Sequence, residues 1–248
     1  MSTEQKMPML ELDGVYLNYH SSRKTFDHGT HHVLNGVTLS VAEGETLGII
    51  GRNGVGKTTL MECIMGLLPL RSGDMQFADT DIARLPAERR AALGIGYVPQ
   101  GRQIFPLLTV EENLRIGLPA RRDGGRQIPD FIFELFPVLK DMLGRRGGDL
   151  SGGQQQQLAI GRALVIDPKL LILDEPTEGI QPNIVHEIGD IIRHLIDELG
   201  LTVMLVEQKL PFARRVADRF VILDRGRLMA AGPMAELGDD LIREYLTV

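Results

Sequence analysis

The chain has little of several features that define other classes of protein. Its 248 residues include one cysteine, Cys63, which excludes a disulfide scaffold and favours a reducing compartment. No apolar run reaches the roughly 18 residues that a membrane-spanning helix requires. Basic residues number 27 against 33 acidic ones, so no nucleic-acid partner is expected. The opening MSTEQKMPMLELDG also lacks the basic and apolar regions of a signal peptide.

Glycine, by contrast, is abundant. Its 28 residues are about 11% of the 248 in the chain, against a usual share of about 7%. Many of them fall in two clusters, Gly48, Gly51, Gly54 and Gly56 in the first and Gly144, Gly147, Gly148, Gly152 and Gly153 in the second. Glycines gather where the backbone takes positive φ or lies against a ligand. The two clusters are therefore candidate functional segments of a soluble, globular protein.

The hydrophobic pattern predicts an α/β fold. Alternating and continuous apolar runs predict strands over residues 10–19, 33–41, 46–50, 94–99, 170–174, 203–207, 219–224 and 227–232. Helices are predicted over 57–67 and 183–199, over 129–143 with a break or kink at Pro137, and after capping boxes that begin at Thr109 and Ser151. Strands that alternate with helices favour a largely parallel sheet. The strand-poor segment 101–160 is predicted to be an inserted helical subdomain.

Residues 51–58, GRNGVGKT, match the phosphate-binding pattern G-x-x-x-x-G-K-[ST] between a predicted strand and a predicted helix. Small residues let successive N–H groups turn toward a phosphate, and the helix N-terminus adds its dipole. Lys57 would reach the outer phosphates, and the Thr58 hydroxyl would coordinate Mg²⁺. A glycine-rich turn that binds nothing is the weaker alternative. The candidate nucleotide-binding residues of this phosphate loop are Gly51, Asn53, Gly54, Gly56, Lys57, Thr58 and Thr59.

A second acidic element, LLILDEP, spans residues 170–176. A buried strand that ends in two carboxylates places them at the carboxyl edge of the sheet, beside the phosphate loop. Asp174 would hold Mg²⁺ through water, and Glu175 would polarise the attacking water. Alone, this pattern equally fits a strand that ends in solvated acids, but the phosphate loop upstream favours the catalytic interpretation.

The segment LSGGQ, residues 150–154, narrows the class of protein. Ser151 is predicted to cap a helix whose first N–H groups, at Gly152 and Gly153, are left bare for an anion. A phosphate loop alone leaves kinases, GTPases, helicases and transporter ATPases open. With LSGGQ, the acidic strand end and Gln100, the chain resembles the ABC-type ATPase family along essentially its whole length.

That resemblance implies a fold and a set of partners. It implies a single ABC ATPase domain over residues 1–248, with a P-loop NTPase (RecA-like) core at 1–100 and 161–248, an N-terminal antiparallel β region and a helical subdomain at 101–160. ATP and Mg²⁺ would be the cofactors of an ATPase. In the family, two subunits pair head to tail, so that Ser151, Gly152, Gly153 and Gln154 of one would face the nucleotide of the other. The resemblance also implies that Tyr19 stacks on adenine and that Gln100 contacts Mg²⁺.

Several segments resemble one branch of the family, which imports branched-chain amino acids and urea. They are VPQGRQIFPLLTVEENL, DEPTEGIQPN, LVEQ and, nearest to the urea importer, IPDFIFELFPVLKDMLGRRGGDLSGGQQQQLAI. As partners the resemblance implies a second ABC ATPase subunit, in a heterodimer or, for the isolated chain, a homodimer. It also implies integral membrane permease subunits and, indirectly, an extracytoplasmic solute-binding protein. The chain would then lie at the cytoplasmic face of the plasma (inner) membrane. An importer of branched-chain amino acids, other amides or other amino acids, a soluble non-transport ABC ATPase, and an efflux or lipid-export ATPase remain alternatives.

Two positions depart from the common family pattern. Residues 178–181 read EGIQ where the family often has S-A-L-D, and Gln208 stands where the family often has a histidine at the γ-phosphate. A glutamine can donate a hydrogen bond but carries no titratable proton, so slower or differently timed hydrolysis is a hypothesis. The histidine-rich stretch 20–32 is expected to be a solvated loop rather than a metal site, and Cys63 is expected to lie in the core.

Overall fold

The computed structural model describes residues 8–19 and 31–246, of which Asn18, Tyr19, His31 and His32 are described by their backbone alone. Most of the histidine-rich stretch therefore lies outside the described residues. The strands are β1 (Pro8–Tyr19), β2 (His31–Ala42), β3 (Thr46–Ile50), β4 (Ser72–Phe77), β5 (Thr80–Asp81), β6 (Ile95–Val98), β7 (Leu170–Asp174), β8 (Thr202–Val206), β9 (Arg219–Asp224) and β10 (Arg227–Pro233). All strands predicted from the sequence are confirmed, while β4 and β5 were not anticipated.

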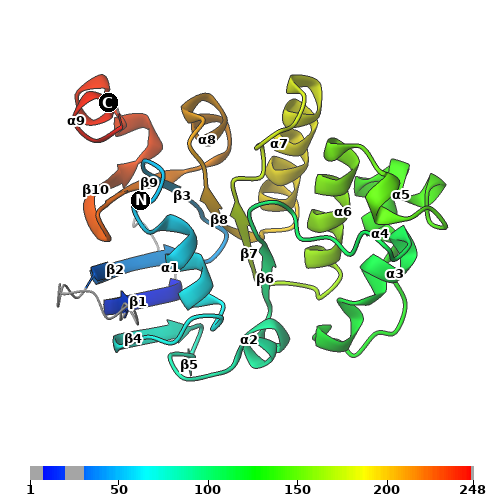
Figure 1. Cartoon of the computed structure of the whole chain (residues 1–248), viewed down its shortest axis with the longest axis horizontal. Coiled ribbons are helices and arrows are strands. Elements are labelled where there is room, and N and C mark those ends of the chain that lie inside the picture. The colour runs from blue at the N-terminus through cyan, green and yellow to red at the C-terminus, as the bar shows by residue number, and fades with distance from the viewer. Residues whose placement is uncertain (1–7, 20–30, 247–248) are drawn as a thin grey trace, which may run out of the picture.

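These strands form two sheets (Figure 1). The core sheet has the order β10-β9-β3-β8-β7-β6 and is parallel except at the β9–β10 hairpin. The second sheet, β2-β1-β4-β5, is antiparallel and contains both N-terminal strands. Every residue of β3, β7 and β8 is buried, as expected for strands covered on both faces. The predicted parallel sheet and N-terminal antiparallel region are confirmed.

The helices are α1 (Lys57–Ile64), α2 (Ala87–Leu93), α3 (Val110–Arg115), α4 (Asp130–Leu135), α5 (Pro137–Asp141), α6 (Gly152–Leu164), α7 (Pro182–Asp197), α8 (Leu210–Val216) and α9 (Asp239–Tyr245), with short 3-10 turns at Leu118–Ala120, Gly147–Asp149 and Met234–Glu236. Pro137 separates α4 from α5, which confirms the predicted break. Both capping boxes are present, at Thr109 with Glu112 and at Ser151 with Gln154. No strand lies within residues 101–160, all of which are described, and α6 continues across residue 160 to Leu164.

Two large hydrophobic clusters lie on the two sides of the core sheet. One packs α1 and the antiparallel sheet against it, through residues such as Leu60, Leu10 and Ile49. The other packs α6, α7 and the helices of residues 101–160 (called the helical segment below) against the opposite face, through residues such as Leu158 and Ile192. The helical segment is therefore attached to one face of the sheet, at the right of Figure 1, and the antiparallel sheet to the other.

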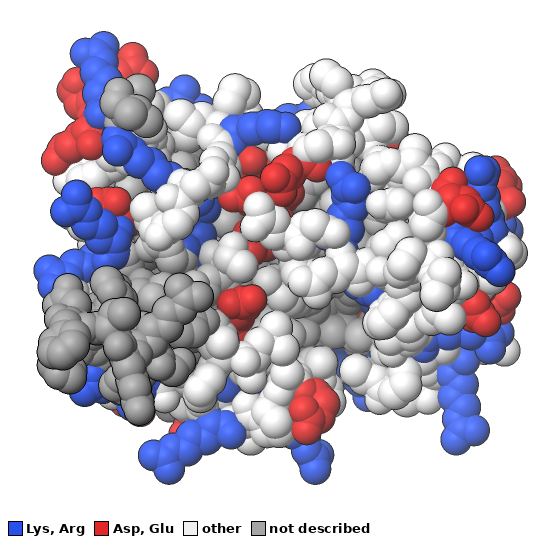
Figure 2. All heavy atoms as spheres, in the orientation of Figure 1, with Lys and Arg blue, Asp and Glu red and all other residues white. Residues whose placement is uncertain are grey.

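The surface carries charges of both signs. On the face shown in Figure 2, basic and acidic side chains of the described residues are interspersed, and neither sign forms a continuous patch there. Within residues 8–19 and 31–246, no helix combines the length and the apolar character needed to cross a membrane.

Candidate nucleotide-binding site

The phosphate loop connects β3 to α1 and is shaped by close backbone contacts. Gly54 has φ +76° and Gly56 has φ +109°, values that favour glycine. A Cβ atom on Gly51 would lie 2.4 Å from the Leu223 carbonyl oxygen, so no larger residue fits. Helix α1 begins directly after Gly56 without a side-chain cap, so its first N–H groups are available to an anion.

The floor of the loop is a stack of three backbone segments. A Cβ atom on Gly56 would lie 2.9 Å from the Val33 carbonyl oxygen, and one on Gly226 only 2.1 Å from the same oxygen. Gly226 lies in the turn between β9 and β10, and its N–H donates to the Val55 carbonyl. The antiparallel sheet, the β9–β10 turn and the phosphate loop therefore touch at one point.

Lys57 is buried against its own loop. Only 5% of the residue is exposed, and Nζ donates to the carbonyl oxygens of Gly51 and Arg52, at 2.8 Å each. Nζ also lies 3.9 Å from Glu175 Oε1. Burial lowers the pKa of Lys57, and nearby carboxylates, Glu175 foremost, oppose that effect. The ammonium group is thus held at the loop by carbonyl oxygens and one weak ion pair.

Asp174 ends β7 at the carboxyl edge of the sheet and is only 1% exposed. Among the described residues, no donor meets hydrogen-bond geometry at either of its carboxylate oxygens. Burial raises the pKa of this side chain to about 6, an effect that the neighbouring Thr58 hydroxyl only partly offsets. A buried carboxylate without a partner, beside a hydroxyl, is an oxygen donor set that suits Mg²⁺. The residues present therefore fit the metal that the sequence predicts.

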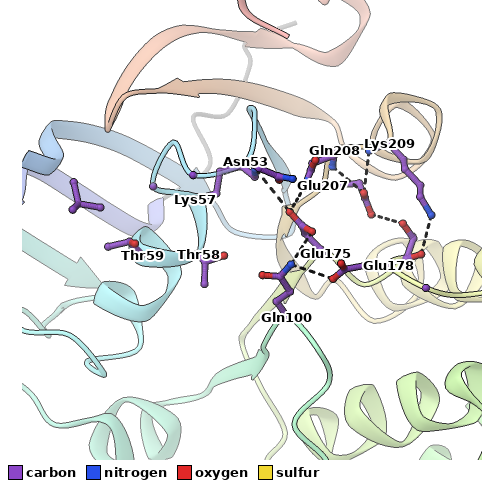
Figure 3. Close-up of a pocket in the computed structure, with 15 residues that line it drawn as sticks. Asn53, Lys57, Thr58, Thr59, Gln100, Glu175, Glu178, Glu207, Gln208 and Lys209 are labelled. Carbon is purple, nitrogen blue, oxygen red and sulfur yellow. Dashed lines mark hydrogen bonds and ion pairs between the residues drawn. The ribbon is translucent and has the colours of Figure 1, made fainter. Parts of the chain in front are cut away.

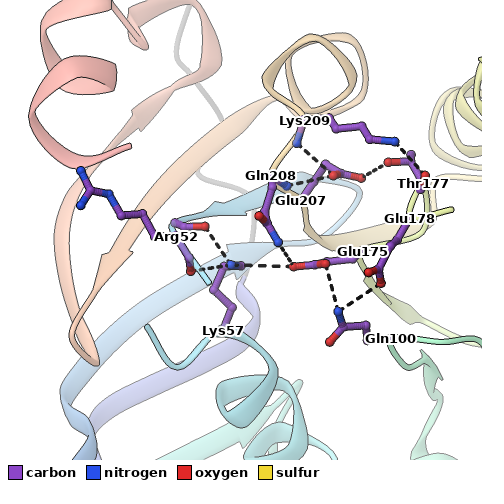
Figure 4. Close-up of polar contacts among 10 residues, drawn as sticks. Arg52, Lys57, Gln100, Glu175, Thr177, Glu178, Glu207, Gln208 and Lys209 are labelled. Atoms are coloured by element: carbon purple, nitrogen blue, oxygen red, sulfur yellow. Dashed lines mark hydrogen bonds and ion pairs between the residues drawn. The ribbon is translucent and has the colours of Figure 1, made fainter. Parts of the chain in front are cut away.

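Glu175 follows in a left-handed backbone conformation, with φ +49°. Its Oε1 accepts a short hydrogen bond from Gln208 Nε2, and its Oε2 accepts one from Gln100 Nε2 at 3.2 Å. Gln100 Nε2 also donates to Glu178 Oε2 at 3.1 Å (Figure 4). Residues that follow β6, β7 and β8 therefore converge on one carboxylate.

A pocket of about 520 Å³ lies between these groups (Figure 3). It is lined by the phosphate loop and α1 on one side and by the residues after β6, β7 and β8 on the other. The predicted site residues that line it are Asn53, Gly54, Gly56, Lys57, Thr58, Thr59, Gln100, Glu175 and Gln208. Gly51 and Asp174 do not line the pocket; Lys57 Nζ bonds the Gly51 carbonyl, and Asp174 lies buried at the end of β7.

The remaining predicted residues are not brought into this pocket. Ser151, Gly152, Gly153 and Gln154 lie at the first turn of α6, where Ser151 Oγ accepts from the Gln154 N–H at 3.3 Å. The structure places Tyr19 at the end of β1, and its side chain lies outside the described residues. Within one chain, therefore, the two glycine clusters are separate.

One part of the site was missed by the sequence predictions. Glu207 is 3% exposed, and it accepts hydrogen bonds from the Thr177 hydroxyl at 2.7 Å, the Gln208 N–H at 2.8 Å and the Lys209 N–H at 3.0 Å. It thereby ties the segment after β7 to the loop that carries Gln208 (Figure 4). The signal was available, because Glu207 follows a buried strand at the same sheet edge as the acidic pair.

Fold and site together define a P-loop nucleotide-binding protein. Residues 34–178 match the sequence model described as ABC transporter, and the chain belongs to this family. As a member it is an ATPase that binds ATP together with Mg²⁺.

The chain is similar to the ATP-binding proteins of several transport systems. It is 42% identical to the high-affinity branched-chain amino acid transport ATP-binding protein BraG of Pseudomonas aeruginosa, covering 82% of this chain and 87% of BraG. It is 37% identical to the probable branched-chain amino acid transport ATP-binding protein LivF of Archaeoglobus fulgidus, covering 83% and 88%. It is also 38% identical to the lipopolysaccharide export system ATP-binding protein LptB of Escherichia coli, covering 84% and 87%. Among solved structures, the dimeric ATP-binding cassette MJ0796 bound to ADP and Pi superimposes with a TM-score of 0.79 at 25% identity, over 91% of this chain and 99% of that one.

Proposed function

We propose that this ATPase drives a small-solute importer from the cytoplasmic face of the plasma membrane. The convergence of Lys57, Gln100, Glu175 and Gln208 on one pocket beside the phosphate loop supports ATP hydrolysis. The identity with the branched-chain amino acid transport proteins BraG and LivF is the observation that carries solute import. Its partners would be a second ABC ATPase subunit and integral membrane permease subunits, with an extracytoplasmic solute-binding protein acting through the permease.

The chemistry assigned to this chain is water attack on the γ-phosphate. The N–H groups of residues 53–58 and the ammonium of Lys57 would bind the phosphates, for which Lys57 must exchange its two carbonyl partners for phosphate oxygens. Thr58, Gln100 and Asp174 would hold Mg²⁺, which neutralises phosphate charge when bound. Glu175 would orient the water and accept its proton. Gln208 would donate a hydrogen bond to the γ-phosphate, the role that a histidine often has in the family.

The first turn of α6 would complete a second nucleotide site in a head-to-tail dimer. Ser151 and Gln154 satisfy each other through the capping box, which does not use the N–H groups of Gly152 and Gly153. Because these residues lie outside the pocket of their own chain, a phosphate bound there would belong to the partner's nucleotide. The dimeric structure of the similar cassette MJ0796 supports the formation of a dimer.

The solute that we assign is urea. The support is the resemblance of residues 128–160 to the urea importer; DEPTEGIQPN resembles the wider branch that imports branched-chain amino acids and urea. Branched-chain amino acids are the second candidate, which the identity of 42% with BraG favours. The chain itself does not meet the solute, so only transport measurements separate the two.

Two experiments test the proposal. Lys57→Ala and Glu175→Gln should each lower steady-state ATP turnover of the purified chain by about 100-fold or more, because each removes a group at the reacting phosphate. Asp141→Asn, an exposed change away from the pocket, is the matched control. Turnover that survives either active-site substitution would refute the residue assignment.

The solute is tested in a strain that lacks the chain, with other transporters of each solute removed. Loss of radiolabelled urea uptake at micromolar urea, with normal leucine uptake, is expected. Normal urea uptake with lost leucine uptake would replace urea by branched-chain amino acids, and normal uptake of both would refute both assignments.

A further inference from the structure

The segment that follows β6 adopts an unusual backbone conformation. Gly101, Arg102 and Gln103 have φ values of +73°, +69° and +43°, so two residues with side chains lie in the left-handed region in succession. Such conformations cost free energy in L-residues and persist where the surroundings impose them. The contacts of residues 101–103 should therefore include groups that hold this backbone in the left-handed region.

Helix α6 imposes this conformation. Arg162, near the end of the helix, donates from Nη2 to the carbonyl oxygens of Arg102 at 3.3 Å and Gln103 at 2.9 Å. The Arg162 guanidinium also lies over the Phe105 ring, 5.3 Å from its centroid. The left-handed segment is thus fastened to the body of α6.

The Arg102 side chain turns back from this segment toward two others. Its Nη2 donates to the Glu178 carbonyl oxygen at 3.0 Å, and its Nη1 lies 3.5 Å from Gln155 Oε1. The guanidinium also packs on the first turn of α6, because a Cβ atom on Gly152 would lie only 3.4 Å from Nη1. Among the described residues, no carboxylate forms an ion pair with Arg102, so the positive charge is directed at backbone and amide oxygens.

The same segment reaches the candidate catalytic carboxylate. Gln100 donates to both Glu175 and Glu178, while Arg102 holds the carbonyl group of Glu178. Glu178 therefore accepts two hydrogen bonds from this segment, one at its side chain from Gln100 and one at its backbone carbonyl from Arg102. Residues 100–102 connect the first turn of α6 to the loop that carries Glu175.

We propose that Arg102 is a positioning residue for ATP hydrolysis, which latches the first turn of α6 to the Glu178 backbone. The proposal rests on the proposed function, in which α6 of one subunit faces the nucleotide of the other. The latch then connects two nucleotide sites: a phosphate bound at Gly152 restricts Glu175 of the same chain, which acts on a different ATP. The expected consequence is cooperativity between the sites.

The test compares Arg102→Gln with wild type, with Arg115→Gln as the control. Arg115 is an exposed arginine of α3, and its ion-pair partner among the described residues is Glu111. Three quantities are measured on the purified full chain: the affinity for a fluorescent ATP analogue, the steady-state turnover and the Hill coefficient for ATP. For Arg102→Gln we expect an unchanged affinity, a turnover lower by about tenfold and a Hill coefficient close to 1, because a charged hydrogen bond is lost.

The outcomes separate positioning from folding and from the proposed function. A parallel loss of affinity, melting temperature and turnover would mean a structural role and would overturn the latch, as would wild-type turnover and cooperativity. Arg102→Lys guards against a poorly folded first variant: it keeps the charge but loses the forked donor, and we expect it also to lose cooperativity. Full wild-type behaviour of Arg102→Lys would overturn the two-point latch. A wild-type chain that neither binds nor hydrolyses ATP would instead refute the proposed function.

Discussion

Asp174 offers a direct test of how this site trades stability for function. Its carboxylate is buried and has no hydrogen-bond partner within the described part of the chain, so the ionised form is unfavourable until a cation is bound. Replacement by the neutral isostere, Asp174→Asn, removes that cost. We therefore expect Asp174→Asn to stabilise the nucleotide-free protein at neutral pH although it removes a predicted Mg²⁺ ligand.

The size of the effect follows from the pKa of Asp174. Burial raises this pKa from 3.8 to about 6, a difference that corresponds to about 3 kcal/mol of unfolding free energy. The folded protein binds the proton more tightly than the unfolded chain. The cost is therefore complete above pH about 6, declines as the pH falls, and is absent below pH about 4. For a chain of this length, about 3 kcal/mol shifts the melting temperature by about 6 to 12 °C.

The assay is thermal unfolding of wild type and Asp174→Asn in EDTA between pH 4.5 and 8, with Asp141→Asn as an exposed control. We expect Asp174→Asn to melt higher at pH 8 and the difference to shrink toward pH 4.5. Excess Mg²⁺ and ATP should stabilise wild type more than the variant, because ligands that bind only the folded state raise its stability. A variant that melts at or below the wild-type temperature at pH 8 would refute the reasoning.

Three further predictions follow from buried polar groups. Glu207→Ala removes the acceptor of three donors and should lower the unfolding free energy by about 3 kcal/mol in guanidinium titrations. The exposed control Glu198→Ala should change it by less than about 0.5 kcal/mol. Equal unfolding midpoints for the two variants would contradict this expectation. Arg90 is 2% exposed and donates to the carbonyls of Leu85, Cys63, Ile64 and Ala83, so Arg90→Met should cost about 3 kcal/mol by calorimetry, and a loss under about 1 kcal/mol would count against the importance of these bonds. Burial raises the pKa of Cys63 to about 12, so the native protein should resist maleimide at pH 8 while the denatured chain reacts fully; rapid labelling of the native protein would contradict a buried thiol.

Much of the core could be predicted from the sequence because its signals are local. The strands that flank the phosphate loop are continuous apolar runs, and the capping boxes at Thr109 and Ser151 mark their helices within four residues. The carboxyl edge of a parallel sheet then brings Lys57 and Glu175 together without further information.

The features that were missed depend on contacts between distant residues. Strand β4 reads SGDMQF, with only Met75 and Phe77 buried, so its apolar alternation is too short to distinguish from a loop. The role of Glu207 depends on Thr177, which lies 30 residues earlier. The left-handed backbone of Arg102 depends on Arg162, which lies 60 residues later. Patterns of apolar residues carry no information about such pairs.

The stack of Gly56, Val33 and Gly226 gives the phosphate loop a mechanical property. Because the loop rests on backbone from both sheets, its shape depends on their separation. A methyl group at Gly226 would press on the Val33 carbonyl from a position outside the pocket lining. The phosphate loop is in this sense a contact point between the core sheet and the antiparallel sheet. A nucleotide that changed the shape of the loop would therefore displace backbone of both sheets.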